Sequence, residues 1–190
     1  LGGSESIIIA QRAQAFARSG QVREALDEYW RARQAGHQDL DLPVTLMAIF
    51  RQQEQYDAAL AIHHALTDDD RTNQFVLREH GAVLFAMADY PGSSSAYDLA
   101  IEKINLASVK RADIDDLISL YQGTAEAARE SGNVFRATIL YANLADYLAG
   151  HGYRDRATDV RALAEKNARA SALKRSRLCL LYTSPSPRDR

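Results

Sequence analysis

The sequence predicts an all-α fold, an α-solenoid built from helix–turn–helix units, and three observations lead to this prediction. First, helix-forming residues dominate a chain of 190 residues that contains only 4 prolines and 10 glycines. Second, apolar residues recur at helical spacing, as in Leu46, Ile49 and Phe50. Third, residues of matching size recur every 34 positions. Short amphipathic helices that recur in this way need neighbours on both sides to bury their apolar faces.

The stretch from residue 46 to residue 66 sets the register of this repeat. It predicts two short helices joined by a polar turn at residues 51–55, and Ala59 lies early in the second helix. Ala25 stands one repeat step before Ala59, and Ser93 stands one repeat step after it. Small side chains let two helix backbones cross closely, so we expect these three residues to face the first helix of their unit. The same step relates further sets of positions: Ala13, Met47 and Gly81; Phe16, Phe50 and Leu84; Val22, Tyr56 and Tyr90; Tyr29, His63 and Tyr97; Ala32, Leu66 and Ala100.

A helix–turn–helix unit with this period, and with small and aromatic residues at these offsets, resembles the tetratricopeptide repeat. The resemblance covers residues 7–101 as three units. It departs from the usual pattern at the tryptophan position, which holds Ile9, Pro43 and Leu77, and at the turn glycine, which is kept only as Gly20. The resemblance implies a superhelical scaffold that binds a protein or peptide in its concave groove.

The helical segments that follow have a longer period. The next matching turn holds Gly132, and the step from Ser93 to Ala137 exceeds the repeat step by about ten positions, which indicates an insertion. Residues 102–150 are therefore predicted to form a fourth, longer helix pair, with a first helix at residues 113–131 and a second helix that ends at Gly150. The inner face of that first helix is expected to hold Ile114, Leu117, Ile118, Tyr121, Ala125 and Ala128.

Residues 151–178 are predicted to form a basic terminal helix. The part from residue 154 to residue 178 carries eight Lys and Arg against three Asp and Glu, a net charge of +5. Such a helix is most often simply solvated, and the alternative is contact with an anionic membrane or a nucleic acid.

The last residues differ in character from the rest of the chain. Residues 179–190 begin CLLYTSPSPRD, which resembles the translation of an adapter used in preparing sequencing libraries, and we interpret this tail as artefactual. The alternative is a disordered tail rich in Pro and Ser. The chain also begins with Leu1 instead of Met. We therefore expect it to be a fragment whose natural sequence continues at both ends.

The charge and the motif content argue against several classes of function. A net charge of -2 gives no electrostatic basis for binding nucleic acid. No apolar run approaches the roughly 18 residues needed to span a membrane. The sequence contains no nucleophile elbow, zinc-protease motif, phosphate loop or dinucleotide fingerprint. We therefore expect a binding protein instead of an enzyme, with no cofactor and no metal, and with membrane contact only through missing segments or the basic helix.

Three local motifs allow both a structural and a functional interpretation. Residues 91–95, with the sequence PGSSS, suit a turn and a helix N-cap better than a phosphate loop. His63 and His64 point about 100° apart on a helix, so His63 is expected to be a packed, hydrogen-bonded core residue instead of a metal ligand. The acidic run at residues 68–70 is expected to end one helix and cap the next, since the spacing of a calcium loop is absent.

The candidate binding site is the concave groove, which the first helix of every unit lines in such scaffolds. The period assigns the following residues to the groove: Gln14, Arg18, Arg51, Gln52, Arg78 and Phe85. Arginine pairs bidentately with carboxylates, so this polar and positive floor suits an acidic protein segment. The alternative is simple solvation of exposed arginines.

The stretch at residues 46–66 also resembles one family more closely, the lipopolysaccharide assembly protein B family. The matching residues are Phe50, Arg51, Asp57, Ala59, Ile62, His63 and Leu66. The resemblance implies a bacterial adaptor with cytoplasmic repeats, an N-terminal inner-membrane anchor and a C-terminal zinc module. Such an adaptor brings the enzyme that commits a precursor to lipid A to its membrane protease. A different interpretation is the regulatory arm of an enzyme or transcription factor whose active domain lies outside this fragment.

Overall fold

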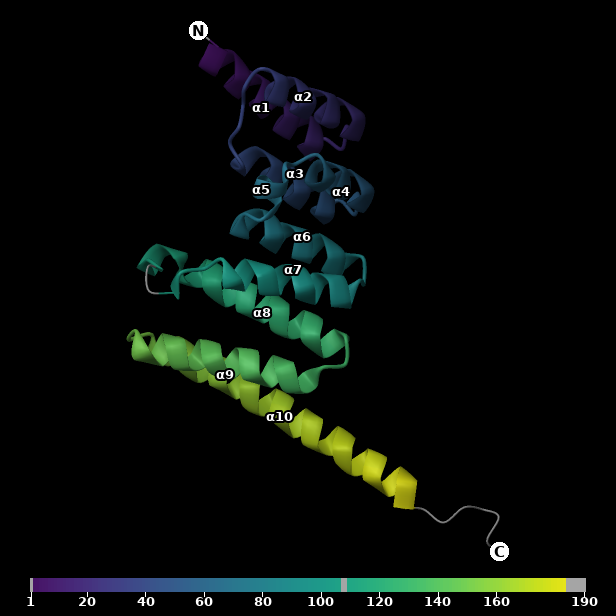
Figure 1. The fold of residues 1–190 in the computed structure, drawn as a ribbon, viewed down its shortest axis with the longest axis vertical. Helices are drawn as coiled ribbons and strands as arrows, with labels where there is room; N and C mark the ends of the chain where they lie inside the picture. Colours follow the sequence, from purple (N-terminus) through teal and green to yellow (C-terminus); the bar gives the residue numbers. More distant parts are fainter. Residues whose placement is uncertain (1, 107–108, 184–190) are drawn as a thin grey trace, which may run out of the picture. The chain divides into compact units, whose positions relative to one another are not determined.

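The computed structural model describes residues 2–106 and 109–183 (Figure 1). Side chains are described for residues 5–106, 109–170 and 172–173. Helices make up 81% of the described residues, which contain no strand, and this confirms the predicted all-α class. The chain divides into two compact units, Leu1–Asp113 and Ile114–Arg190.

The first unit consists of three helix pairs that follow one another along the chain (Figure 1). Its helices are α1 (Gly2–Arg18) and α2 (Val22–Gln34), α3 (Asp41–Gln52) and α4 (Tyr56–His64), the short α5 (Asp68–Arg71), α6 (Gln74–Ala86) and α7 (Tyr90–Glu102), followed by the 3-10 helix η2 (Arg111–Asp113). The two helices of each pair pack against each other, and the first helices of successive pairs are also in contact, α1 with α3 and α3 with α6. The apolar core therefore continues from one pair into the next.

The turn inside each pair is built in the same way and recurs at the repeat step. The residue directly before the N-cap of the second helix takes the left-handed conformation. Its φ is 77° at Gly20, 60° at Glu54 and 62° at Ala88. The next N–H then donates to the carbonyl oxygen five residues earlier, from Gln21 to Phe16 (3.0 Å), from Gln55 to Phe50 (2.8 Å) and from Asp89 to Leu84 (2.9 Å). This is the hydrogen bond of a Schellman cap, which satisfies the free carbonyls at a helix C-terminus. All three turns thus share this geometry, although only the first of them has a glycine at the left-handed position.

Replacing Ala88 by Gly is expected to stabilise the chain by about 0.5–1 kcal/mol, because a Cβ is strained at positive φ and the gain exceeds the entropy that glycine adds to the unfolded chain. The measurement is the free energy of unfolding in urea. The control is Ala61→Gly in the middle of α4, an exposed position with helical backbone, where the same change should cost up to about 1 kcal/mol. Two changes of the same sign would contradict this account of the turn.

The small residues predicted at the helix crossings lie where expected. Ala25, Ala59 and Ser93 are fully buried. The Oγ of Ser93 donates a hydrogen bond of 2.8 Å to the carbonyl oxygen of Gly81 on α6. The prediction that serines of residues 91–95 cap the helix is wrong, however. The cap is Asp89, whose carboxylate accepts from the N–H of Gly92, because α7 begins earlier than predicted and Ser93 falls inside it.

The acidic run at residues 68–70 also differs from the prediction, because it forms most of the short helix α5 instead of joining two longer helices. The side chain of Thr67 caps α5 by accepting from the N–H of Asp70 at 3.2 Å. The following helix α6 is capped by Asn73, whose Oδ1 accepts from the N–H of Phe75 at 2.9 Å.

The second unit contains α8 (Ile114–Glu130), α9 (Val134–Gly150) and α10 (Arg154–Thr183), with α9 in contact with both neighbours. The first two helices lie where the fourth, longer pair is predicted, and the predicted inner face of α8 is buried except for Ile118, which is half-buried. The left-handed turn recurs at Gly132 and Gly152. The predicted basic helix is α10, where Arg161 pairs with Asp146 of α9 at 3.1 Å and Arg156 pairs with Asp115 of α8. The side chains of its last basic residues, from 174 on, and the predicted tail after residue 183 lie outside the described part of the chain.

Candidate functional site

The residues predicted to line a groove lie on the three first helices of the first unit. We call them the first-helix row: Gln14 and Arg18 of α1, Arg51 and Gln52 of α3, and Arg78 and Phe85 of α6. Arg18 and Gln52 are exposed, and the other four side chains are half-buried. All six are therefore at least partly open to solvent.

Polar contacts tie the three first helices together next to this row. The side-chain amide of Gln53 donates to the carbonyl oxygens of Ala17 (2.9 Å) and Arg18 (3.2 Å), which joins the ends of α3 and α1. The Nε of Arg51 donates to Oε1 of Glu79 at 2.6 Å, which joins α3 to α6. Since bonds to a carboxylate or to otherwise free helix-end carbonyls are among the stronger polar contacts, these two links hold neighbouring first helices in register.

The two row residues of α6 are engaged close to their own position. The guanidinium of Arg78 lies over the ring of Phe75, 5.7 Å from its centroid. The ring of Phe85 meets that of Tyr90 edge-on, with centroids 5.3 Å apart. Arg51 is thus joined to α6 by its ion pair with Glu79, and the backbone carbonyl of Arg18 is joined to the end of α3 by Gln53. Arg78 and Phe85 instead contact aromatic rings.

Glu79 places a buried carboxylate next to the first-helix row, and the repeat pattern does not predict it. Its side chain is only 9% exposed, and its carboxylate binds Arg51. A ligand carboxylate would have to compete with Glu79 for this guanidinium. Helical spacing marks Glu79 as unusual, because it falls on the buried face of α6 between Val76 and Val83. An amphipathic helix normally has an apolar residue at such a position.

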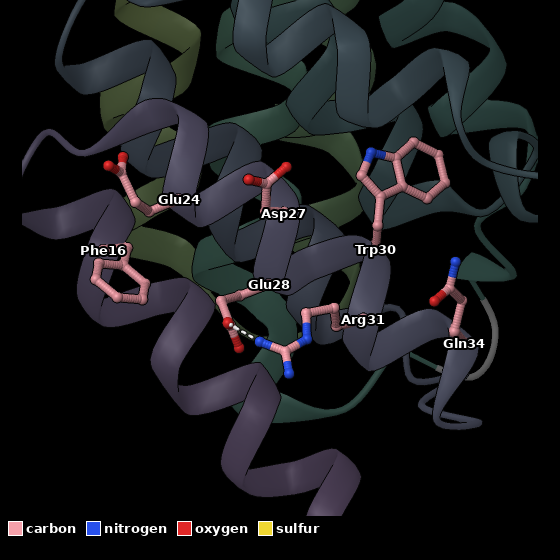
Figure 2. A pocket seen from close by; sticks show the side chains of 7 residues that line it. All are labelled: Phe16, Glu24, Asp27, Glu28, Trp30, Arg31 and Gln34. Atoms are coloured by element: carbon pink, nitrogen blue, oxygen red, sulfur yellow. Dashed lines mark hydrogen bonds and ion pairs between the residues drawn. The ribbon is translucent and has the colours of Figure 1, made fainter.

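A second feature is a pocket beside α1 and α2 with a volume of about 520 Å³, shown in Figure 2. Its lining is acidic and aromatic: Phe16, Glu24, Asp27, Glu28, Trp30, Arg31 and Gln34. Glu28 is only 5% exposed, and its Oε1 accepts from Arg12 (2.9 Å) and from Arg31 (2.7 Å). Its second oxygen, Oε2, is buried without a hydrogen-bond partner among the described residues.

The repeat predicts an apolar residue where Glu28 stands. The residues one and two repeat steps later are Ile62 and Ala96, and both are buried. A carboxylate at a core position costs desolvation energy, which Arg12 and Arg31 offset only on one oxygen. Comparing the three units position by position would have identified Glu28 from the sequence.

His63 of α4 is stacked on His80 of α6, with ring centroids 3.7 Å apart and an interplanar angle of 12°. His63 is only 8% exposed, so the predicted core placement is confirmed. The predicted hydrogen bond is wrong, because both ring nitrogens are buried without a partner among the described residues. Burial is the main cause that lowers the pKa of His63 to about 4, and His80, His64 and Arg71 lower it further. Burial also lowers the pKa of His80.

No protein-family model matches the sequence, and a comparison with curated proteins found no significant similarity. In the part of the chain that the structure describes, no helix is both long and apolar enough to cross a membrane. The described side chains also include no cluster of three or more His, Cys, Asp or Glu that would hold a metal ion. The class that the fold defines is therefore an all-helical protein of packed helix pairs.

Proposed function

We propose that this protein is a scaffold that binds a segment of a partner protein, and that its first unit is an α-solenoid of tetratricopeptide-like helix pairs. The observation that carries the proposal is the continuity of the first helices, because α1 contacts α3 and α3 contacts α6. Adjacent elements of this kind present one extended surface instead of a closed pocket, and extended surfaces suit extended peptides.

The chemistry of the first-helix row supports an acidic segment as the ligand. Arg18 contributes an exposed guanidinium, and Gln14 and Gln52 contribute amides that bind peptide backbone. Phe85 adds a half-buried aromatic surface for an apolar side chain. The charge of Arg51 is partly balanced by Glu79, so we assign the main electrostatic role to Arg18. The narrower expectation of an adaptor in lipopolysaccharide biosynthesis stays a prediction that depends on the short resemblance at residues 46–66.

The double variant Arg18→Glu with Gln52→Glu is expected to weaken binding of acidic peptides by about tenfold or more, because it puts two carboxylates where the ligand presents its own. The ligands are short peptides rich in Asp and Glu, selected on a peptide array and then titrated by calorimetry. The same peptides with Asn and Gln in place of the acids should not bind. Arg51 is left intact, since Arg51→Glu would set a second carboxylate against the buried Glu79 and lower stability as well as binding.

The matched control introduces the same change of charge in the second unit, as Arg154→Glu with Asn143→Glu. Both residues are exposed, on α10 and α9. This control should bind acidic peptides as the parent chain does. An equal loss in both double variants would mean that net charge alone, and no site on the first helices, governs the binding.

A further inference from the structure

The pocket beside α1 and α2 has a lining charge opposite to that of the first-helix row. Three carboxylates, from Glu24, Asp27 and Glu28, face one guanidinium, from Arg31. Counting Arg12, which binds Glu28 from outside the lining, still leaves more carboxylates than guanidiniums. A concave surface with an excess of one charge concentrates ligands of the opposite charge, so this pocket favours cations.

Glu28 supplies evidence that is independent of the charge count. It is buried, it replaces the apolar residue found at the same position of the other two units, and its Oε2 has no partner among the described residues. Burying a carboxylate with one oxygen unpaired is unfavourable unless a further donor reaches it. Its other oxygen binds the guanidiniums of Arg12 and Arg31, so a guanidinium is the kind of donor that this carboxylate accepts.

Trp30 supplies the third observation. Its side chain is 46% exposed, although Trp is among the residues that gain most from burial. The residues at the equivalent positions of the other units are His64 and Asp98, so the packing of the repeat does not require a large aromatic here. In Figure 2, Trp30, Asp27 and Glu24 stand along the same side of α2. An exposed indole beside carboxylates is the arrangement that binds a guanidinium by stacking and ion pairing together.

We propose that this pocket binds an arginine side chain that a partner protein presents, with the guanidinium against the indole of Trp30 and the carboxylates of Glu24 and Asp27, while Glu28 adds negative charge from the other side of α2. Arginine fits better than lysine, because its planar group both stacks on an indole and forms paired hydrogen bonds with carboxylates. The inference does not rest on the first-helix row. It gives the protein a second contact, of opposite charge, with a protein ligand.

The chain contains its own reporter for this pocket, since Trp30 is the single tryptophan of the sequence. The whole chain is titrated with a short blocked peptide that contains one arginine, and tryptophan emission is recorded. Two matched peptides carry lysine or citrulline in place of the arginine, and citrulline keeps the shape of the side chain without its charge. We expect a saturable change in emission with the arginine peptide, an affinity several-fold lower with the lysine peptide, and no saturable change with the citrulline peptide.

The double variant Glu24→Gln with Asp27→Asn tests the carboxylates and keeps Trp30 in place. It should lower the affinity for the arginine peptide by about five- to tenfold, with an unchanged helical circular dichroism spectrum. The control is Asp57→Asn with Glu102→Gln, which removes the same charge from exposed positions of α4 and α7 and should keep the affinity of the parent chain.

Three results would overturn the proposal. The first is an equal response to the arginine and citrulline peptides. The second is an unchanged affinity in the variant that lacks the carboxylates of Glu24 and Asp27. The third is a shift of Trp30 emission with protein concentration alone, because a second copy of the chain would then be the occupant of the pocket.

Discussion

The substitution Gly81→Ala is expected to lower the free energy of unfolding by about 1–3 kcal/mol, although alanine is the better helix former by about 1 kcal/mol. A Cβ on Gly81 would lie 2.8 Å from Cδ1, 2.9 Å from Cε1 and 3.0 Å from Cγ of Tyr97. Tyr97 is buried on α7, so its ring has little room to move away. The hydrogen bond from Ser93 to the Gly81 carbonyl also fixes the distance between the two helices. The measurement is urea unfolding of the full chain.

The matched control is Gly150→Ala. Gly150 is the last residue of α9, and a Cβ there would meet no atom within 4 Å beyond its chain neighbours and the adjacent backbone of its own helix. This variant should keep or slightly raise the stability, because it gains helix propensity without a clash. A double-mutant cycle with Tyr97→Leu should recover part of the loss in Gly81→Ala, since the smaller side chain removes the clash. A Gly81→Ala chain as stable as its parent would mean that α6 and α7 do not cross as closely as described.

Acidification is expected to destabilise the first unit between about pH 6.5 and pH 4 through the stacked pair of His63 and His80. The pKa of His63 is lowered from 6.5 to about 4 in the folded chain, mainly by burial, so in this window the unfolded chain binds a proton that the folded chain excludes. The free energy of unfolding therefore falls as the pH falls, by up to about 1.4 kcal/mol per pH unit for this residue. His80 acts in the same direction, because burial and the charge of His64 lower its pKa more than Asp89 raises it. The measurement is the thermal midpoint as a function of pH.

The test variant is His63→Tyr, which places at this position the residue that stands there in the other two pairs, as Tyr29 and Tyr97. Its thermal midpoint at pH 7 shows whether it folds, and its midpoint should depend less on pH between 6.5 and 4 than that of the parent. The control is His64→Gln, which removes an exposed imidazole from the same helix and should retain most of the dependence. A His63→Tyr chain with the full acid sensitivity of the parent would assign that sensitivity to other groups.

The helix pairs and their crossings follow from the sequence because their causes are local or periodic. Ala25, Ala59 and Ser93 are small residues at one repeat position, and each is buried where two helices cross. The positions of Ile114 and Leu117 on α8 are predictable for a similar reason, since helical spacing alone assigns them to one face.

The candidate sites depend on contacts between residues far apart in the sequence, and no repeat or spacing rule predicts these. Arg51 and Glu79 are 28 residues apart, so their pairing exists only once α3 and α6 have packed. The repeat identifies Glu28 as an unusual residue at an apolar position, but its two ion pairs, with Arg12 and Arg31, are known only from the structure. The stacking of His63 on His80 likewise joins two separate helix pairs. The first-helix row could be predicted as a list of residues, but the carboxylate that binds Arg51 could not.

The shared turn at residues 20, 54 and 88 makes the chain modular along its length. Deleting residues 55–88 would join Glu54 to Asp89, and Asp89 already follows a left-handed residue in the intact chain, as Gln55 does. The carbonyl oxygens of Gln55 and Asp89 also accept equivalent hydrogen bonds, from Ala59 and Ser93. Such a deletion is therefore expected to rebuild a complete turn at the junction, with α3 paired to α7. Insertions and losses of one whole period preserve the local geometry, so a chain of such helix pairs can change in length by one pair at a time.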